Sequence, residues 1–299
     1  MKGSMSTLER SRRITGILFC LPALALLLVF VLYPLGRLIV GSFTDWKGYG
    51  SAGKFVGLEN YTKLSQISYF KEMVIATIFY VIADTILKNI LSFTLALSLD
   101  KKGKGRVNRS LMRTIWYLPA LLSGIVTGIC WHIMYNYNNG IINQLLSSVG
   151  LAKVNWLETR GLINVCIVVA ALWAGVGSTC IIYLAGLQGI STELYEAATI
   201  DGADEGQVIR HITIPLMAPS ITINVMTTSI GAFKAYELPA KIGTGPSDSA
   251  KLVASKIVEL GSGAYYGRGL ALAVILTAVI TAISLLQLYY LRKNEEKNG

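Results

Sequence analysis

A carboxylate and an amine lie four residues apart in an apolar part of this sequence. Asp84 and Lys88 interrupt residues 73–99, which are otherwise rich in apolar side chains. On a helix, a spacing of four puts both side chains on one face, where they can pair. Charges inside an apolar segment normally face other helices or a wet cavity. We therefore predict an intramembrane ion pair that holds helices in register, and the alternative is direct contact with a transported molecule.

The remaining reactive side chains do not form a catalytic or metal-binding set. The two histidines lie far apart, at positions 132 and 211, with no nucleophile or metal ligand beside them. Residues 48–54 read G-x-x-x-x-G-K but continue with Phe55, where a nucleotide-binding loop has Ser or Thr. The cysteines occur singly, without zinc or disulfide spacing, and are Cys20, Cys130, Cys166 and Cys180. We predict that this chain is not an enzyme and that it binds no metal and no cofactor itself.

The composition is that of a membrane protein. Of the 299 residues, 53% are hydrophobic and only 15% are charged, whereas a soluble domain has roughly 25% charged residues. The net charge of +10 comes from lysines and arginines at the ends of apolar runs, a pattern that anchors cytoplasmic loops beside a membrane. A nucleic-acid-binding protein would instead gather its basic residues on one face. We expect a multi-pass protein that lies in membrane lipid and binds no nucleic acid.

Six apolar stretches are long enough to cross a membrane, which takes about 20 residues at about 1.5 Å of helix each. They cover residues 14–36, 73–99, 114–135, 161–188, 212–234 and 269–291. Basic residues precede the first stretch and follow the last, so we expect both termini in the cytoplasm. The predicted fold is an all-α integral membrane protein with a single transmembrane domain, residues 14–291. Short cytoplasmic segments, residues 1–13 and 292–299, flank it.

The third stretch has two features that leave alternatives open. Gly124 and Gly128 are spaced as in pairs that let two helices approach closely, which fits packing inside one bundle or contact in a dimer. The aromatic end of the stretch, with Trp131 and Tyr135, fits an interfacial belt or a lining for sugar rings. After it, we expect a short amphipathic helix at residues 141–149 in an outer loop.

The stretch EAATIDGADEGQVIRHITIPLMAP, residues 196–219, is polar although it lies between two apolar spans. Ser191 or Thr192 can cap a short helix over about residues 192–200, and Gly202 suits the left-handed residue that ends it. We expect this segment to lie in the cytoplasm.

A second short helix should follow the first. Asp204, with Gln207 three residues later, resembles a capping box. Pro215 cannot continue a helical hydrogen-bond ladder, so the fifth span should begin with a bend. These residues by themselves fit a plain connector as well as a docking element for a partner.

Part of this segment resembles the EAA loop of ATP-binding-cassette importer permeases. Two positions differ from the family pattern, since Gly206 and Ile209 stand where aromatics are often found. FTDW followed by FVGLENYTKL, and later YLAGLQGISTELYEAATIDGA, extend the resemblance to carbohydrate-uptake permeases of the larger maltose and glycerol-phosphate type. The residues that carry the loop resemblance are Glu196, Ala197, Ala198, Asp201, Gly202, Ala203, Ile212 and Pro215.

The resemblance implies the type I importer permease fold, with residues 190–214 as a coupling loop that sits in a cleft of an ATPase subunit. It also implies several partners: a second permease subunit in a heterodimer, two ATPase subunits that hold ATP and Mg, and an extracytoplasmic solute-binding protein. The implied substrate is a sugar or oligosaccharide, and the implied location is the inner membrane of a bacterial cell. Two alternatives stay open, namely a permease for another solute such as a glycerophosphodiester, and an ion-coupled secondary transporter.

The family also places a substrate site halfway along the central spans. Aromatic faces there would suit sugar rings. Lys234 would hydrogen-bond hydroxyls or pair with an acidic sugar, unless its side chain simply extends to the outer surface. The residues at matching depth are Trp173, Gly177, Phe233, Lys234 and Tyr236.

Overall fold

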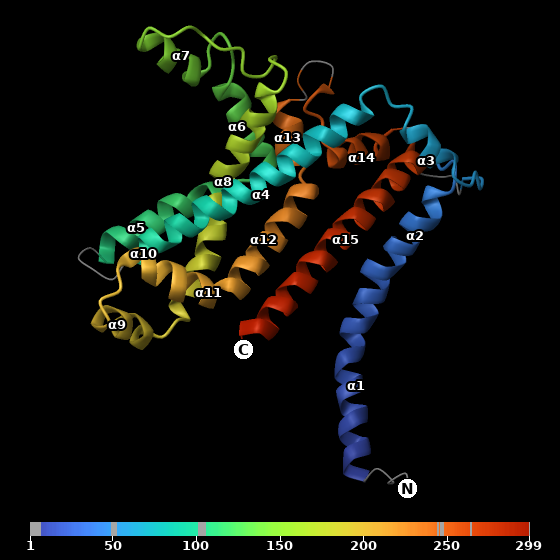
Figure 1. The fold of residues 1–299 in the computed structure, drawn as a ribbon. Coiled ribbons are helices and arrows are strands. Elements are labelled where there is room, and N and C mark those ends of the chain that lie inside the picture. The colour runs from blue at the N-terminus through green and yellow to red at the C-terminus, as the bar shows by residue number, and fades with distance from the viewer. Residues whose placement is uncertain are drawn as a thin grey trace. The chain divides into compact units, whose positions relative to one another are not determined.

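The fold is that of a computed structural model, which describes residues 7–48, 53–100, 106–243, 245, 248–263 and 265–298. Within these ranges the chain is helical (Figure 1), and its only β-pairing is a single bridge between Thr44 and Phe55. The chain divides into two compact units. The first unit comprises residues 1–65 and 260–274, and the second comprises residues 66–259 and 275–299.

The first unit contains the first predicted span. Helix α1 (Thr7–Leu27) continues through a wider π turn (Leu28–Leu32) into α2 (Tyr33–Ser42), so the apolar helix extends beyond the predicted end at residue 36. In the most apolar part of Thr15–Ser42, no residue is buried by the rest of the chain. An apolar surface of this size normally contacts lipid or another protein.

Polar and aromatic contacts organise the part of the first unit around α3 (Glu59–Leu64). Asn60, on α3, donates from Nδ2 to the carbonyl oxygens of Ser42 at 2.9 Å and of Thr44 at 2.7 Å. Trp46 packs edge-on against Tyr266, with ring centroids 4.8 Å apart. Tyr266 is the first residue of α15 (Tyr266–Asn298), which begins in this unit and continues into the second.

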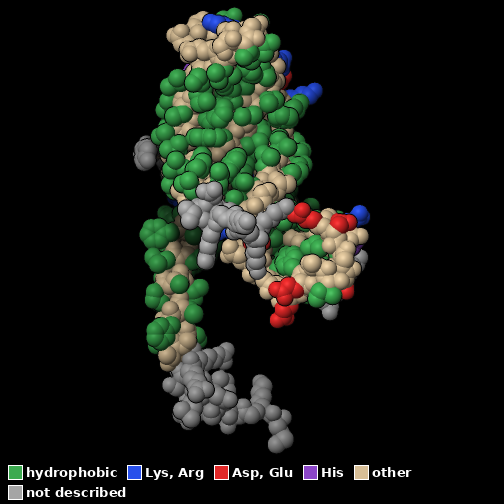
Figure 2. All heavy atoms as spheres, turned by 90° about the vertical axis from the view of Figure 1, so that its left-hand side faces the viewer, with side chains coloured by type: hydrophobic (Ala, Val, Ile, Leu, Met, Phe, Trp, Pro, Cys, Tyr) green, Lys and Arg blue, Asp and Glu red, His purple; other side chains and the backbone are tan. Residues whose placement is uncertain are grey.

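Three long helices form the framework of the second unit. They are α4 (Phe70–Asp100), α8 (Leu162–Gln188) and α12 (Ala218–Phe233), and each packs against the other two. One side of α4 exposes a row of isoleucines at helical spacing, Ile78, Ile82 and Ile86. Hydrophobic side chains cover much of the surface in Figure 2, as expected for helices that lie in lipid.

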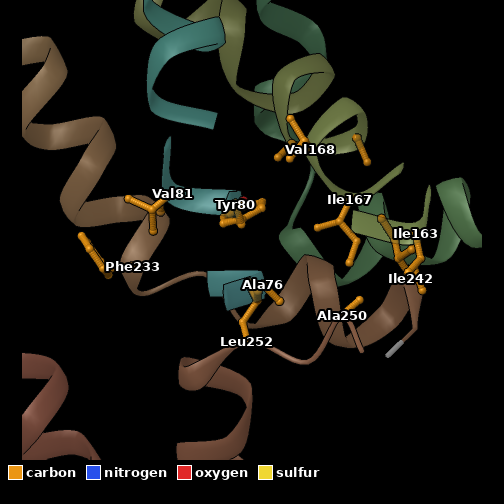
Figure 3. Close-up of a cluster of buried hydrophobic side chains, with 13 residues drawn as sticks. Ala76, Tyr80, Val81, Ile163, Ile167, Val168, Phe233, Ile242, Ala250 and Leu252 are labelled. Carbon is orange, nitrogen blue, oxygen red and sulfur yellow. The ribbon is translucent and has the colours of Figure 1, made fainter. Parts of the chain in front are cut away.

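The core of the second unit lies where these helices meet the chain after α12. Figure 3 shows Tyr80 and Val81 of α4 beside Ile167 of α8 and Phe233 of α12. Leu252 joins this cluster from the segment between α13 (Glu237–Ile242) and α14 (Val253–Gly261). The chain after α12 is therefore packed onto the long helices by buried apolar side chains.

Four of the six predicted spans are confirmed as helices that are long and apolar enough to cross a membrane. They are Thr15–Ser42, Phe70–Asp100, Leu162–Gln188 and Tyr266–Tyr290. The third and fifth predicted spans are bent helix pairs instead. Six spans are reached within the described residues when each bent pair is counted as one.

The third predicted span, residues 114–135, is not one straight helix. Helix α5 (Arg106–Tyr117) ends in a 3-10 turn (Leu118–Leu121), and α6 (Gly124–Met134) continues at an angle of 96°. Pro119 lacks the N–H that would extend α5. Ser123 is extended, with ψ 154°, and its Oγ accepts the N–H of Val126 at 3.3 Å, which caps α6. The proline and the cap break a run whose length alone predicted a continuous span.

The glycine pair of α6 packs against α13 of the same chain. A Cβ on Gly128 would stand 2.6 Å from the Lys241 Cβ and 2.8 Å from the Leu238 carbonyl oxygen. A Cβ on Gly124 would stand 3.0 Å from the Glu237 Cβ. Packing within the bundle is thus confirmed as a role of this pair.

The short helix predicted at residues 141–149 forms as α7 (Ile141–Ser148). It is held by Asn143, which is fully buried. The Asn143 amide donates to the carbonyl oxygens of Tyr137 and Val154, and it accepts the Val154 N–H and the Trp156 indole N–H. In Figure 1, α7 lies at the opposite end of the second unit from α9 and α10.

Candidate functional site

Helix α9 (Thr192–Ile200) forms over the predicted residues. At its N-terminus, Ser191 Oγ accepts the N–H of Glu193 at 3.3 Å. The carboxylate of Glu193 lies in the first turn, where the helix dipole favours a negative charge. The predicted cap is confirmed, with Ser191 as the capping residue.

The C-terminus of α9 depends on Gly202, whose φ is +76°. The Gly202 N–H donates to the Thr199 carbonyl at 3.1 Å, and the Ala203 N–H donates to the Ala198 carbonyl at 2.9 Å. These two bonds form a Schellman motif. No atom outside the local chain comes within 4 Å of a Cβ built on Gly202, so the backbone conformation requires the glycine, not a lack of space.

A second short helix, α10 (Glu205–Val208), begins at a complete capping box. Asp204 Oδ1 accepts the Gln207 N–H at 2.9 Å, and Gln207 Oε1 accepts the Asp204 N–H at 2.9 Å. These reciprocal bonds confirm the predicted box and fix the direction in which the chain leaves α9.

The chain then bends into α12. A π turn (Ile209–Thr213) leads into the short α11 (Ile214–Leu216), and the axis changes by 69° before Ala218. Ile212 is half-buried in the π turn, and Pro215 is exposed in α11. The predicted bend is confirmed, but it lies two residues after Pro215, at Met217.

The α9–α10 segment presents an acidic surface with two exposed large apolar side chains, Leu194 and Ile200. Figure 2 shows acidic side chains gathered on this part of the molecule; the exposed ones are Glu193, Glu196, Asp201, Asp204 and Glu205. Ile200 is 86% exposed at the end of α9. Ala197 is exposed, whereas Ala198 is buried within the chain, so Ala197 is the alanine that a partner can approach.

A large hollow lies between α9 and the end of α4. Its volume is about 930 Å³, and its wall includes Asp100 at the end of α4, Glu196 and Ala203. On this side of α9, the Tyr195 hydroxyl lies 3.3 Å from the Thr213 Oγ1. The segment is therefore tied to the end of the π turn that precedes α11 and α12, while its acidic side chains stay exposed.

A second cavity lies at the middle of the three long helices. Its volume is about 260 Å³, close to the lower end of the roughly 300–1,000 Å³ of small-molecule sites. Its lining residues come from α4, α8 and α12 and are Tyr80, Asp84, Lys88, Gly175, Ser178, Thr179, Ile182, Asn224, Thr227, Thr228, Gly231 and Ala232.

The predicted ion pair lines this cavity. Lys88 Nζ donates to Asp84 Oδ2 at 2.7 Å, and the Asp84 side chain is only 1% exposed. Lys88 lies against Gly175 of α8, where an added Cβ would stand 2.7 Å from the Lys88 Cε. The pair thus forms within α4, and α8 leaves room for its lysine.

Hydrogen bonds between helices hold the cavity wall next to the ion pair. Asn89 on α4 donates to Thr228 Oγ1 on α12 at 2.8 Å. Tyr183 on α8 donates its hydroxyl to Asn89 Oδ1 at 2.6 Å. The three helices are therefore joined through one buried amide.

Two polar groups of the cavity wall have no hydrogen-bond partner among the described residues. They are the Asp84 Oδ1 atom and the whole side-chain amide of Asn224, which is fully buried. A buried donor or acceptor without a partner costs about 1–3 kcal/mol. Both groups have almost no accessible surface, so a molecule in the cavity does not reach these atoms in the observed packing.

The five residues predicted to contact substrate lie elsewhere, and none of them lines this cavity. Gly177 is buried against the backbone of Trp116 and Tyr117 at the end of α5. Trp173 faces a separate hollow that it shares with Trp116.

The other three predicted residues lie at the end of α12 and in the short segment directly after it. Phe233 is buried in the core, while Lys234 and Tyr236 are exposed. The Tyr236 hydroxyl donates to the neighbouring Glu237 carboxylate at 3.3 Å.

Asn224, Thr228 and Ile200 are not among the site residues predicted from the sequence. A signal for Asn224 was present, because it is the one amide in the 23-residue run from His211 to Phe233, which carries no Asp, Glu, Lys or Arg. A polar side chain at such depth normally marks a helix contact or a pathway.

Known proteins resemble the chain over most of its length. The family model described as "Binding-protein-dependent transport system inner membrane component" matches residues 88–295. The trehalose/maltose transport system permease protein of Thermococcus litoralis is 31% identical over 278 residues, which are 91% of this chain and 92% of that protein. An arabinooligosaccharides transport system permease protein of Halalkalibacterium halodurans is 31% identical over 288 residues, which are 95% of this chain and 89% of that protein.

A solved structure resembles the fold. It is a bacterial alginate ABC transporter in complex with an alginate pentasaccharide-bound periplasmic protein; one of its chains superposes with a TM-score of 0.81 at 22% identity. The match covers 95% of this chain and 96% of the other. Both bent helix pairs therefore belong to a fold of the ABC-importer permease type.

Proposed function

This chain belongs to the family of binding-protein-dependent transport system inner membrane components, and from this premise we propose that it imports a sugar or oligosaccharide as the permease subunit of an ABC importer. The relatives named for trehalose/maltose and for arabinooligosaccharides support the choice of substrate class. The chain would reside in the inner membrane of a bacterial cell as a multi-pass subunit.

The observation that carries the coupling mechanism is the doubly capped α9–α10 segment. Local hydrogen bonds cap both ends of α9 and the start of α10. The segment would therefore move as a rigid unit when an ATPase subunit moves against it. Glu196 makes no ion pair within the described residues and is exposed. We propose that Glu196 anchors a polar or cationic group of an ATPase subunit, and that Ala197 and Gly202 allow its close approach.

The partners proposed are a second permease subunit, two ATPase subunits that hold ATP and Mg, and an extracytoplasmic solute-binding protein. Closure of the ATPase dimer, driven by the ATP that these subunits bind and hydrolyse, would move residues 196–210. Because α9 is tied to Thr213 and the chain continues through the bend into α12, this movement would tilt α12 against α4 and α8. The cavity between them would then open to one side of the membrane at a time.

Glu196→Arg and Gly202→Asp test this coupling. Each should abolish ATP-dependent uptake while the amount of protein in the membrane stays unchanged. Glu158→Arg, an equal charge reversal at an exposed outer-loop position, is the matched control and should retain uptake. Transport that survives both loop variants would show that the segment is only a connector.

Two further measurements separate this function from its alternatives. Uptake that persists after the proton gradient is collapsed excludes an ion-coupled carrier, for which Asp84 would be the acid. The purified chain without its partners should hydrolyse no ATP. A permease for another solute, such as a glycerophosphodiester, would show ATP-dependent uptake of that solute and of no saccharide.

The substrate contacts predicted from the sequence remain part of this proposal. These proposed contacts are Trp173, Gly177, Phe233, Lys234 and Tyr236. Lys234 would hydrogen-bond sugar hydroxyls or pair with an acidic sugar, and the aromatic side chains would contact sugar rings. Lys234→Met distinguishes the two roles of the lysine, because a loss of acidic oligosaccharides alone would indicate a charge pair.

A further inference from the structure

Helix α7 carries a row of apolar side chains that the described part of the chain leaves exposed. The row consists of Ile141, Leu145 and Val149, which are 53%, 63% and 71% exposed. Their spacing of four residues places them on one side of the helix. Ile142 and Leu146, which flank the row, are half-buried. One side of α7 is therefore apolar from its first residue to Val149, the residue that ends the helix.

Hydrogen bonds on the opposite side of α7 fix the direction in which this row points. Asn143 is fully buried, and its amide binds the backbone of Tyr137 and Val154. Between the two sides, Gln144 and Ser147 are polar and exposed. A rotation of α7 that covered the apolar row would break the bonds of Asn143, so the row stays at the surface.

The chain around α7 carries almost no charge. Lys153 is the one charged residue between His132 and Glu158, whereas roughly a quarter of the residues in a soluble domain are charged. A helix with one apolar and one polar side typically lies in the membrane–water interface, with its apolar side among the acyl chains. The composition of this segment therefore favours lipid as the neighbour of the row.

The end of α6 indicates where the membrane surface lies. Three exposed isoleucines follow one another along α6 at intervals of four residues, as on a helix that faces lipid; they are Ile125, Ile129 and Ile133. Tyr137 comes four residues later and is 47% exposed, and Lys153 Nζ lies 6.0 Å from its ring centroid. Tyrosine and lysine side chains gather where a span leaves the hydrocarbon. Because Asn143 binds the Tyr137 carbonyl, α7 begins at this level.

We propose that α7 is an interfacial helix whose row of Ile141, Leu145 and Val149 lies among lipid acyl chains at the membrane surface opposite α9 and α10. In the predicted orientation, this is the outer surface. The bonds of Asn143 join α7 to the segments on both sides of it, so the lipid holds the connection between α6 and α8 at the membrane. The proposal needs a membrane protein but does not depend on the solute that is carried.

Spin labels on α7 test this proposal in the complete transporter, reconstituted in nanodiscs of phosphatidylethanolamine and phosphatidylglycerol. Single cysteines are introduced after the exposed Cys20 and Cys130 are replaced by serine, while Cys166 and Cys180 are buried and stay. This background should take up no label by itself. Electron paramagnetic resonance then measures how often each label collides with oxygen, which concentrates in lipid, and with a nickel chelate, which stays in water.

Labels at Leu145→Cys and Val149→Cys should collide often with oxygen and rarely with the nickel chelate. Ser147→Cys, at an exposed polar position of the same helix, is the matched control and should show the reverse. All three side chains are exposed, so these substitutions remove little packing. Co-purification of the complete complex checks that each variant folds.

Three results would overturn the proposal. Labels in the row that collide with the nickel chelate as often as the Ser147→Cys label does would show that the row faces water. Protection from the chelate that appears only when the solute-binding protein is added would assign the row to that partner. Rare collisions with both reagents would assign it to a contact with the second permease subunit. None of these results bears on the importer function, which the uptake measurements test separately.

Discussion

Lys88 on α4 lies against Gly175 on α8, where a Cβ would stand 2.7 Å from the lysine Cε and 3.0 Å from its Nζ. The lysine also holds Asp84 Oδ2 at 2.7 Å. One glycine therefore makes room for the ion pair that the four-residue spacing predicts. Gly175 comes 87 residues after Lys88 in the chain, so their contact is a property of the packed protein.

Gly175→Leu should displace Lys88 and destabilise the second unit. Overpacking of this kind costs typically about 1–3 kcal/mol, which we expect as a lower thermal midpoint of the purified complex. In a Lys88→Ala background the same leucine should cost clearly less, because the clashing side chain is gone. Equal costs in both backgrounds would show that Lys88 and Gly175 do not interact.

Gly128→Leu should separate α6 from α13. The new side chain would collide with the Leu238 carbonyl and the Lys241 Cβ, and backbone cannot move aside as a flexible side chain can. We expect a lower thermal midpoint and faster proteolysis of the outer segments. Gly36→Leu is the control, since no atom lies within 4 Å of a Cβ there; an equal effect of both would contradict the packing role.

The outer helix α14 should lose order in acid because of Glu259. Burial alone raises the pKa of Glu259, but hydrogen bonds from Lys251 at 2.8 Å and Lys256 at 2.5 Å hold that pKa below its ordinary value. A lowered carboxyl pKa stabilises the fold above the ordinary value, and this contribution is lost as the pH falls through the folded pKa.

Hydrogen exchange of the α14 amides measures this effect. Exchange, corrected for its intrinsic pH dependence, should be slow near neutral pH and should rise as the pH falls below about 4.3, the ordinary pKa of glutamate. Glu259→Gln removes the titrating group, so its exchange should be faster at neutral pH and should change less with pH. A wild-type profile that stays flat across this range would contradict the role of Glu259.

Ile200→Ser should weaken the contact with the ATPase subunits and leave the fold unchanged. The side chain is 86% exposed, so its loss removes almost no packing within the chain. We expect less ATPase subunit to co-purify with the complex and slower uptake, at an unchanged thermal midpoint. Leu194→Ser, on the first turn of α9 and less exposed, is a comparison on the same helix. Full retention of the ATPase by Ile200→Ser would exclude Ile200 from the interface.

Local chemistry made several elements predictable. The boundaries of α9, the capping box at Asp204 and the positive φ of Gly202 all depend on residues within a few positions of one another. The same holds for the Asp84–Lys88 pair, which lies on a single helix. Each of these follows from hydrogen bonds or spacing that the chain makes with its own neighbours.

Elements that depend on distant contacts were not predictable in the same way. Residues 114–135 are long and apolar enough for a span, and Pro119 marks where a helix can break. The angle of 96° between α5 and α6, and the packing of the α6 glycines onto α13, are seen only in the folded chain. The depth of a residue along a span likewise does not predict which side chains line the same cavity. Gly177 was predicted to contact substrate because of its depth, but it packs against the end of α5.

The sequence by itself determined that this chain is a multi-pass membrane protein with a capped polar segment between two spans, because hydrophobic length and helix caps are local properties. Only the tertiary structure decided that Asp84 and Asn224 line one cavity and that both carry polar atoms without a hydrogen-bond partner among the described residues. These atoms come from helices far apart in the chain, and which faces of α4, α8 and α12 meet depends on how their side chains interlock. A cavity wall of this kind exists only after the helices have packed.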